Sequence, residues 1–334
     1  MDSAKPMNKT AVLVARAVFN DVLQRLQQHF DVLHNQADAT WSQTELVERL
    51  QGRRGVFVTG TEDIDERLLD GCPQLRAVCS MAVGYNNIDL SACTRRGVLV
   101  SNAPGVLTET TADFGFGLML AAARRITESE IFLRAGRWQR WGHDMFAGVD
   151  VHGATLGVLG MGRIGQAIAR RGALGFGMKV IYHNRTRLDA GIEAAICASW
   201  VDKATLLRDS DHLVLVLPYS AASHHAIGAA ELALMRPNAT LTNIARGGIV
   251  DDRALADALR ERRIAAAGLD VFEGEPALHP ALLELRNVVL TPHIASASVP
   301  TRRAMANLAA DNLIAALCGG TPPTALNPQV LPLA

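Results

Sequence analysis

The feature that most constrains the fold is a glycine pattern near the middle of the chain. The stretch GATLGVLGMGRIG runs from apolar residues into Gly160, Gly162 and Gly165, and a helix-forming stretch, QAIARRGALGF, follows directly. A G-x-G-x-x-G pattern between a strand and a helix is typical of a dinucleotide-binding turn. Its glycines permit the turn, let the backbone approach a pyrophosphate and let the helix pack closely on the strand. We therefore expect phosphates at this helix N-terminus, beside Arg163 and Ile164.

The length of the chain and its alternating patterns predict two α/β domains. A chain of 334 residues exceeds what one core usually organises. Five strand-like runs alternate with helical patterns before the fingerprint, and six more strand-like runs follow, which predicts parallel sheets. Mostly apolar helical patterns lie at residues 109–126 and near the C-terminal end, and we expect the first to be a single buried helix. The sequence predicts a fingerprint-bearing domain over residues 107–297, inserted into a domain formed by residues 1–106 and 298–334.

The charge balance and the cysteines exclude several functional classes. Lys plus Arg and Asp plus Glu both total 33, so no net field draws the protein to nucleic acid or to an anionic membrane. We find no secretory leader and no long apolar span, which predicts a cytoplasmic protein. The five cysteines are odd in number and lack C-x-x-C spacing, so we expect reduced, buried thiols and no metal site.

Three motifs follow the last predicted strands, where an open α/β sheet places its ligand-facing residues. They are NIARGG with Arg246, DVFEGEP with Asp270 and Glu275, and TPHIAS with His293. In order and spacing they resemble the signatures of the D-isomer-specific 2-hydroxyacid dehydrogenases, and MAVGYNNID, TETTAD and GMGRIG match as well. Within that family the chain is most similar to the glyoxylate/hydroxypyruvate reductases and the 2-ketogluconate reductases, through VLTETTAD, VDVHGATLG and NRTR. One departure is Ala295, where the family often has glycine.

The resemblance implies a doubly wound coenzyme domain inserted into a flavodoxin-like substrate domain, with the substrate between them. The implied reaction is NAD(P)-dependent reduction of a small 2-keto acid to the D-2-hydroxy acid. The planar fork of Arg246 suits a carboxylate or ketone oxygen. His293 suits a general acid because imidazole exchanges protons near neutrality. The resemblance gives Glu275 the role of keeping that imidazole protonated. We expect the other histidines, among them His224, His225, His279, His29 and His34, to be solvent-facing or structural.

Further residues are expected to bind substrate, coenzyme or a second subunit. Backbone N–H groups of Val83 and Gly84 suit the substrate carboxylate. The segment AGRWQRW predicts an arm that forms a homodimer, in which Trp141 approaches the partner's site. Additional expected coenzyme positions are Thr111, Pro218, Ile244, Ala245, Asp270, His293 and Ser296.

The second strand of the fingerprint-bearing domain begins a stretch, VIYHNRTRL, that lacks the expected acid. In NAD-specific domains an Asp or Glu at this point binds the adenosine ribose and repels a 2′-phosphate. Asn184 stands there instead, and Arg185 and Thr186 offer a guanidinium and a hydroxyl to a phosphate. Arg187 is as well explained by a solvated turn as by a phosphate contact. We therefore expect NADPH to be preferred over NADH.

Two other interpretations remain open. A phosphoglycerate- or formate-type dehydrogenase could share the fold, although formate dehydrogenases pair their histidine with Gln where Glu275 stands here. A dinucleotide-sensing module resembling the corepressors of this fold would retain the same motifs. The sequence does not select among glyoxylate, hydroxypyruvate and 2-ketogluconate as substrate.

Overall fold

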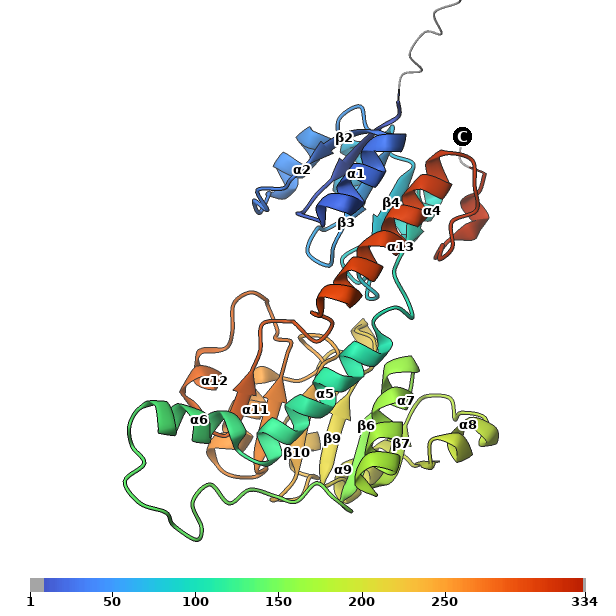
Figure 1. The fold of residues 1–334 in the computed structure, drawn as a ribbon. Coiled ribbons are helices and arrows are strands. Elements are labelled where there is room, and N and C mark those ends of the chain that lie inside the picture. The colour runs from blue at the N-terminus through green and yellow to red at the C-terminus, as the bar shows by residue number, and fades with distance from the viewer. Residues whose placement is uncertain (1–8, 333–334) are drawn as a thin grey trace, which may run out of the picture. The chain divides into compact units, whose positions relative to one another are not determined.

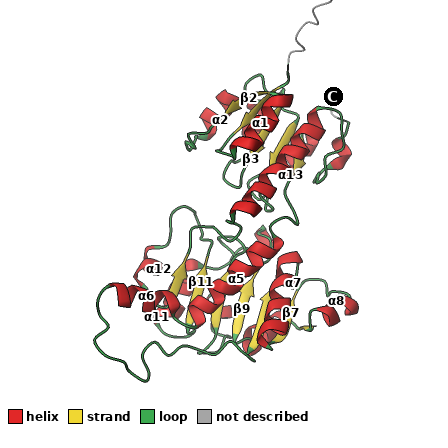
Figure 2. Ribbon diagram, viewed as in Figure 1, coloured by secondary structure: helices red, strands yellow, loops and turns green. Residues whose placement is uncertain are grey.

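The computed structural model describes residues 9–332, and the chain divides into two compact units. One unit extends to Leu107 and resumes at Ser298, and the other comprises Thr108–Ala297. Each unit is an open parallel sheet with helices on both faces (Figures 1 and 2). The predicted fold class, two Rossmann-like domains with one inserted into the other, is confirmed.

The first unit contains a five-stranded parallel sheet in the order β2-β1-β3-β4-β5. This is the flavodoxin-like order, in which the chain moves outward first to one edge and then to the other. The strands are β1 (Ala11–Val14), β2 (Asp31–His34), β3 (Gly55–Val58), β4 (Ala77–Ser80) and β5 (Leu99–Ser101). The connecting helices are α1 (Asn20–His29), α2 (Gln43–Leu50), α3 (Glu66–Gly71) and α4 (Leu90–Arg95). Strands β3 and β4 are buried along their whole length, which explains why their sequences are mostly apolar.

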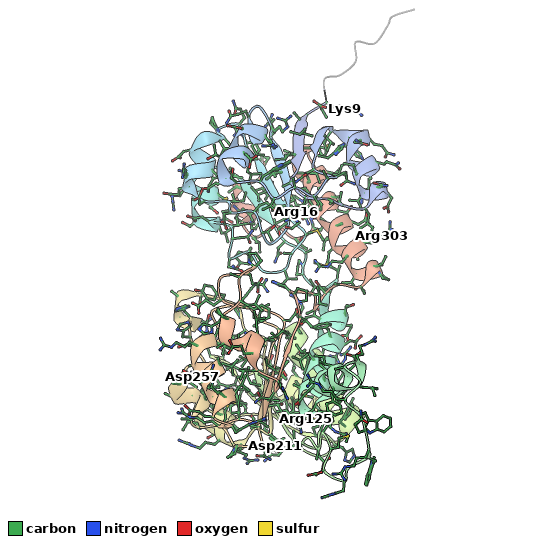
Figure 3. All side chains as sticks on the ribbon, turned by 90° about the vertical axis from the view of Figure 1, so that its left-hand side faces the viewer. Lys9, Arg16, Arg125, Asp211, Asp257 and Arg303 are labelled. Atoms are coloured by element: carbon green, nitrogen blue, oxygen red, sulfur yellow. The ribbon has the colours of Figure 1, made fainter. Side chains whose placement is uncertain are left out.

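The C-terminal helix α13 (Val299–Leu317) returns to this first unit, where it packs against α1, β3 and β4 (Figure 1). Ser298 caps its N-terminus by accepting a hydrogen bond from the N–H of Thr301. Arg303, labelled in Figure 3, pairs with Asp21 and lies 4.4 Å from the ring centroid of Phe19, so it joins α13 to the start of α1. After α13, a short 3₁₀ helix, Pro328–Val330, precedes the end of the described residues.

The second unit contains a seven-stranded parallel sheet in the order β12-β11-β10-β9-β6-β7-β8. Its strands are β6 (Thr155–Leu159), β7 (Lys179–His183), β8 (Ala198–Trp200), β9 (His212–Leu215), β10 (Thr240–Asn243), β11 (Ala266–Leu269) and β12 (Val288–Leu290). The strand order reverses between β6 and β9, which is where doubly wound sheets bind ligands. The sequence predicted six of these strands and missed β8, a three-residue edge strand too short to show a periodic pattern.

The helices of the second unit are α5 (Thr108–Ala123), α6 (Ile126–Arg134), α7 (Arg163–Arg170), α8 (Ala190–Ala195), α9 (Lys203–Asp209), α10 (Ala229–Leu232), α11 (Asp252–Arg260) and α12 (Pro280–Glu284). A π-helical turn, Arg171–Gly175, follows α7, and a 3₁₀ turn, Ala221–Ser223, follows β9. The single helix expected over residues 109–126 is wrong at its end, because Arg125 adopts a left-handed conformation with φ 54° and separates α5 from α6. Helix α5 is buried against α7, β10 and β11, as its apolar sequence predicts.

Within residues 9–332, no helix is long and apolar enough to span a bilayer.

Candidate active site

The glycine turn after β6 brings three segments of backbone into contact. Gly160 has φ +102°, and a Cβ there would lie 2.6 Å from the backbone nitrogen of Leu217. A Cβ on Gly165 would lie 2.4 Å from the carbonyl oxygen of Gly160, so α7 can approach the strand only without a side chain. A Cβ on Gly162 would meet no described heavy atom within 4 Å, which leaves its side of the turn open to a ligand. These residues fit the phosphates of a dinucleotide at the start of α7, next to Arg163 and Ile164.

Asn184, at the end of β7, is tied directly to the glycine turn. Its Oδ1 accepts a hydrogen bond of 2.7 Å from the N–H of Met161, and its backbone carbonyl accepts one of 3.1 Å from Trp200 Nε1. Arg185 and Thr186 follow and are exposed. The position expected to contact the adenosine ribose therefore adjoins the fingerprint, with the Arg185 guanidinium on the surface beside it.

Arg187 has a structural partner. Its guanidinium donates to both carboxylate oxygens of Glu193, at 2.9 and 2.7 Å. Glu193 is buried and also accepts a hydrogen bond of 2.7 Å from the hydroxyl of Tyr182, while that hydroxyl accepts from the N–H of Leu188. The hydrogen bonds from Arg187 and Tyr182 lower the pKa of Glu193 to about 2. The guanidinium of Arg187 is thus paired within the turn, while its side chain stays 65% exposed.

The loop after β10 presents Arg246 and touches the loop after β11. Asn243 shapes the first loop, because its Oδ1 accepts from the N–H of Ala245 and its Nδ2 donates to the carbonyl of Arg246. A Cβ on Gly247 would lie only 1.7 Å from the carbonyl oxygen of Phe272, so the two backbones meet where no side chain fits. Burial lowers the pKa of Arg246, and the charge of Glu275 opposes that effect.

Glu275 joins the loop after β11 to the imidazole of His293. Its Oε1 accepts a hydrogen bond of 2.8 Å from the N–H of Phe272, and its Oε2 lies 2.8 Å from Nδ1 of His293. Burial raises the pKa of Glu275, but the hydrogen bond from His293, the backbone N–H and the charge of Arg246 outweigh burial and hold it below its usual value. Nδ1 of His293 is thus engaged by a carboxylate, and Nε2 is the ring nitrogen left for a substrate.

Asp270 holds the loop that carries His293. Its side chain is fully buried, and its two oxygens accept hydrogen bonds of 2.8 Å from the N–H groups of Ile294 and Ala295, and one of 2.7 Å from the Thr291 hydroxyl. Burial raises the pKa of Asp270, whereas these hydrogen bonds lower it. His293 has φ +54°, a left-handed conformation that costs free energy in a residue with a side chain. We attribute the retention of this conformation to the clamp that Asp270 forms.

The remaining predicted coenzyme residues lie in different settings. Thr111, on the first turn of α5, is buried, and its Oγ1 has no hydrogen-bond partner among the described residues, as expected of a hydroxyl that binds a ligand. Ile244 and Ala245 are buried at the end of β10. Pro218 follows β9 and is exposed, and Ser296 follows the His293 loop and is half-buried.

The predicted substrate-anchoring residues and the predicted dimer arm lie outside the loops described above. Val83 and Gly84 follow β4 in the first unit, where the carbonyl of Val83 accepts a hydrogen bond of 2.7 Å from Asn102 Nδ2. Trp141 lies in the segment after α6, and its side chain is 76% exposed. No described residue contact brings Trp141 to the site.

The expectation of buried thiols holds for three of the five cysteines. Cys72, Cys79 and Cys93 are buried, and burial raises the pKa of Cys79 to about 12. Cys197 and Cys318 are exposed, so the prediction is wrong for these two. Their neighbours in the sequence are apolar, but Cys197 follows the end of α8 with φ 51° and Cys318 ends α13, and both places face solvent.

The sequence interpretation also missed residues that position the site. Asn243 and Asp252 act on backbone groups, the latter by accepting from the N–H of Glu273, and Glu193 fixes the turn after β7. Asn at a strand end commonly bonds nearby backbone, which is a signal that could have identified Asn243. Asp252 accepts from a residue 21 positions away, and no local pattern links the two. Glu193 is eleven residues from Tyr182, and no local pattern links them.

Comparison with known proteins agrees with this geometry. Residues 116–295 match the family model described as the D-isomer specific 2-hydroxyacid dehydrogenase, NAD binding domain. A glyoxylate reductase of Thermococcus gammatolerans is 44% identical over 327 residues, which cover 97% of each chain. The chain belongs to the D-isomer-specific 2-hydroxyacid dehydrogenase family. It is an oxidoreductase of that family, and its second unit contains the NAD-binding domain.

Solved structures of this dehydrogenase family show the same fold. The NADPH-dependent glyoxylate/hydroxypyruvate reductase of Sinorhizobium meliloti, in complex with NADP and malonate, is 36% identical with a TM-score of 0.86, and the match covers 96% of this chain and 97% of that one. A glyoxylate reductase of Paecilomyes thermophila is 31% identical with a TM-score of 0.86, over 97% of this chain and 100% of that one.

We predict that Asp270→Asn destabilises the protein by about 1–3 kcal/mol, because an amide offers one acceptor oxygen where the carboxylate serves two backbone N–H groups. Thermal or denaturant unfolding measures the loss. Asp257→Asn is the matched control, since Asp257 is exposed on α11 (Figure 3) and pairs only with the neighbouring Arg260 in the described contacts. Equal stability of the two variants would contradict the clamp.

Proposed function

We propose that this dehydrogenase reduces a small 2-keto acid, such as glyoxylate, hydroxypyruvate or 2-ketogluconate, to the D-2-hydroxy acid with NADPH. The observation that carries the proposal is the contact of 2.8 Å between Nδ1 of His293 and Glu275, next to the Arg246 loop. An acid, its supporting carboxylate and a guanidinium are the groups that reduction of a keto acid requires. The names of the similar enzymes support the same substrate class.

In the proposed reaction each residue has one role. Arg246 binds the substrate's carboxylate or ketone oxygen and polarises the carbonyl, and the backbone N–H groups of Val83 and Gly84 are further proposed anchors for the carboxylate. Nε2 of His293 donates a proton to the ketone oxygen as the carbonyl carbon is reduced, and Glu275 stabilises the imidazolium before that transfer. The bound coenzyme would supply the hydride, held by the glycine turn and the residues around it.

The proposal is tested by following NADPH oxidation with a panel of glyoxylate, hydroxypyruvate, 2-ketogluconate and phosphohydroxypyruvate. We expect turnover with at least one of the first three. Turnover with phosphohydroxypyruvate alone would indicate a phosphoglycerate-type enzyme, and formate oxidation with NAD would indicate a formate-type one. Dinucleotide binding without turnover of any substrate would indicate a sensing module.

We also propose a homodimer formed through α6 and the segment after it. No residue of α6 is buried within the chain. Ile131, Leu133, Trp138 and Trp141 expose between 56% and 76% of their surface. An apolar group of this kind on a soluble protein marks an interaction surface. In this proposal Trp141 approaches the partner's active site.

Replacing His293 with Ala is expected to lower kcat by about 10²- to 10⁴-fold, the usual contribution of general acid catalysis. NADPH binding, measured by fluorescence titration, should remain. His34→Ala is the control, because His34 is exposed on β2 and lies outside the site's loops and the proposed dimer segment. Near-normal turnover of the His293 variant would remove this imidazole from the mechanism.

Glu275→Gln is expected to move the alkaline limb of the pH profile of kcat to lower pH, by about one pH unit. The pKa of Glu275 is lowered, so its carboxylate is fully charged at and above the pH at which an ordinary glutamate ionises. The stabilisation that this charge gives is lost only as pH falls through the lowered pKa. Glutamine removes this charge at every pH, so the imidazole releases its proton more easily as pH rises. A profile that keeps its position would show that the pair has no role in proton transfer.

The double variant Asn184→Asp/Arg185→Ala is expected to reverse a preference for NADPH over NADH. Aspartate can still accept the hydrogen bond from the N–H of Met161, so the turn is kept while a charge that repels a 2′-phosphate is added. The measurement is the ratio of kcat/KM for the two coenzymes, in which each factor of ten corresponds to about 1.4 kcal/mol. Arg208→Ala, an exposed site on α9, is the control. An unchanged ratio in the double variant would contradict the coenzyme proposal.

A further inference from the structure

Three side chains that the proposed reaction does not use converge next to the active-site loops. Nε2 of His225 lies 3.0 Å from Oε2 of Glu273, and Nε2 of His224 lies 4.0 Å from its Oε1. The two imidazole rings stack with their centroids 3.9 Å apart. One ligand atom from each of the three residues lies within 4.8 Å of the others. Both imidazoles therefore direct Nε2 at the same carboxylate.

The other nitrogen of each ring faces a polar group. Nδ1 of His224 lies 3.2 Å from the hydroxyl of Tyr219, and Nδ1 of His225 lies 4.0 Å from Oδ2 of Asp251. Oδ1 of Asp251 accepts from the N–H of Ala254 and caps α11, so this carboxylate has a fixed position. Metal-binding histidines usually carry a hydrogen-bond partner on the second nitrogen, because it fixes the ring's orientation and its tautomer, and the Tyr219 hydroxyl is such a partner for His224. A simple surface ion pair does not require a polar partner on the second ring nitrogen.

The cluster is supported by three separate segments of backbone. The N–H of His225 donates to the carbonyl of Gly248 at 2.7 Å, next to the Arg246 loop. A Cβ on Gly248 would lie 3.0 Å from the Tyr219 ring and 3.3 Å from His224, so the two loops pack closely. The N–H of Glu273 donates to Asp252 at 3.1 Å. All three donors of the cluster are thus held by the scaffold of the second unit.

We propose that His224, His225 and Glu273 form a binding site for a divalent transition-metal ion, with Zn²⁺ as the best match. Two imidazole nitrogens and a carboxylate oxygen are a donor set that zinc commonly takes, with water in the remaining position. With bonds of about 2.0–2.1 Å, two ligand atoms of one tetrahedral ion lie roughly 3.3 Å apart. The two rings now stack with 22° between their planes, so metal binding requires each ring to turn until both ring planes contain the ion. The side chains have room for this movement, because they are 37–44% exposed.

Metal bound here would join the loop after β9 to the loop after β11. Glu273 lies two residues before Glu275, and the cluster's other contact is with Gly248, two residues after Arg246. The metal would therefore crosslink the segments that carry the proposed catalytic groups. Because it binds the folded arrangement and not the separated segments, it should raise the melting temperature of the protein.

The experiment is a titration of the metal-free, full-length protein with Zn²⁺ and with Co²⁺. Calorimetry gives stoichiometry and affinity, and the visible absorption of Co²⁺ reports the ligand type, since a thiolate ligand adds a sulfur-to-metal charge-transfer band. We expect one equivalent, no thiolate band and a melting temperature that rises with Zn²⁺. Glu273→Gln and His224→Gln should each weaken binding at least about tenfold, because even an outer partner commonly contributes that much.

Three matched variants make the result decisive. His34→Gln removes an exposed histidine of β2, and Cys197→Ser/Cys318→Ser removes the two exposed thiols. Both should bind as the unmodified protein does. Tyr219→Phe keeps the ring and removes the hydroxyl, so it should weaken binding without abolishing it.

The proposal is overturned if Zn²⁺ fails to bind at about 100 μM, far above the range of a built zinc site. It is equally overturned if binding is lost only in the cysteine variant, or is unchanged in both Glu273→Gln and His224→Gln. Circular dichroism and melting of each variant without metal show that it is folded, and the two ligand variants are judged independently. Loss in either folded ligand variant, with both controls unaffected, supports the site.

Discussion

Two loops of the coenzyme unit meet through their backbones, at Gly247 and the carbonyl of Phe272, and the geometry of the site depends on that contact. A side chain at Gly247 would separate the loops, and Arg246 would move away from Glu275. The same loop supplies the N–H of Phe272 that orients Glu275, which in turn engages His293. Three contacts therefore position the guanidinium, the carboxylate and the imidazole, which come from three different strand ends. They are the backbone contact at Gly247 and the two hydrogen bonds of Glu275.

The charges of Glu275 and Arg246 each favour the ionised form of the other side chain. Burial alone would raise the pKa of Glu275 and lower that of Arg246, but each charge opposes the effect of burial on the other. Removing one charge leaves the other without the compensation that opposes its desolvation, so substitutions at these positions should affect more than one step. Asp270 adds a second constraint, because it holds the loop of His293 in a left-handed conformation.

In the turn after β7, the residues considered for coenzyme specificity have different hydrogen-bond partners. Asn184 and Arg185 were singled out because an acid is missing, and the structure places Asn184 against the glycine turn. Arg187 carries the same charge as Arg185 and lies two residues away, yet it is bound to the buried carboxylate of Glu193. A basic run in a sequence therefore does not make each of its charges available to a phosphate. Both arginines are exposed, but the pairing with Glu193 engages only Arg187.

The sequence by itself determined the fold class and the family, because the spacing of glycines and of three strand-end motifs is local and specific. Parallel strands place such motifs at one edge of a sheet, which is why Arg246, Glu275 and His293 could be named in advance as site residues. Only the tertiary structure decided the short edge strand β8, the break at Arg125 and the pairing of Arg187. It also placed the His224–His225 pair against Glu273. The contact of the histidine pair with Glu273 joins residues far apart in the chain, and the pairing of Arg187 depends on the fold of the turn that brings Glu193, six residues away, back to it. In such features the free energy of packing and hydrogen bonding outweighs local preference.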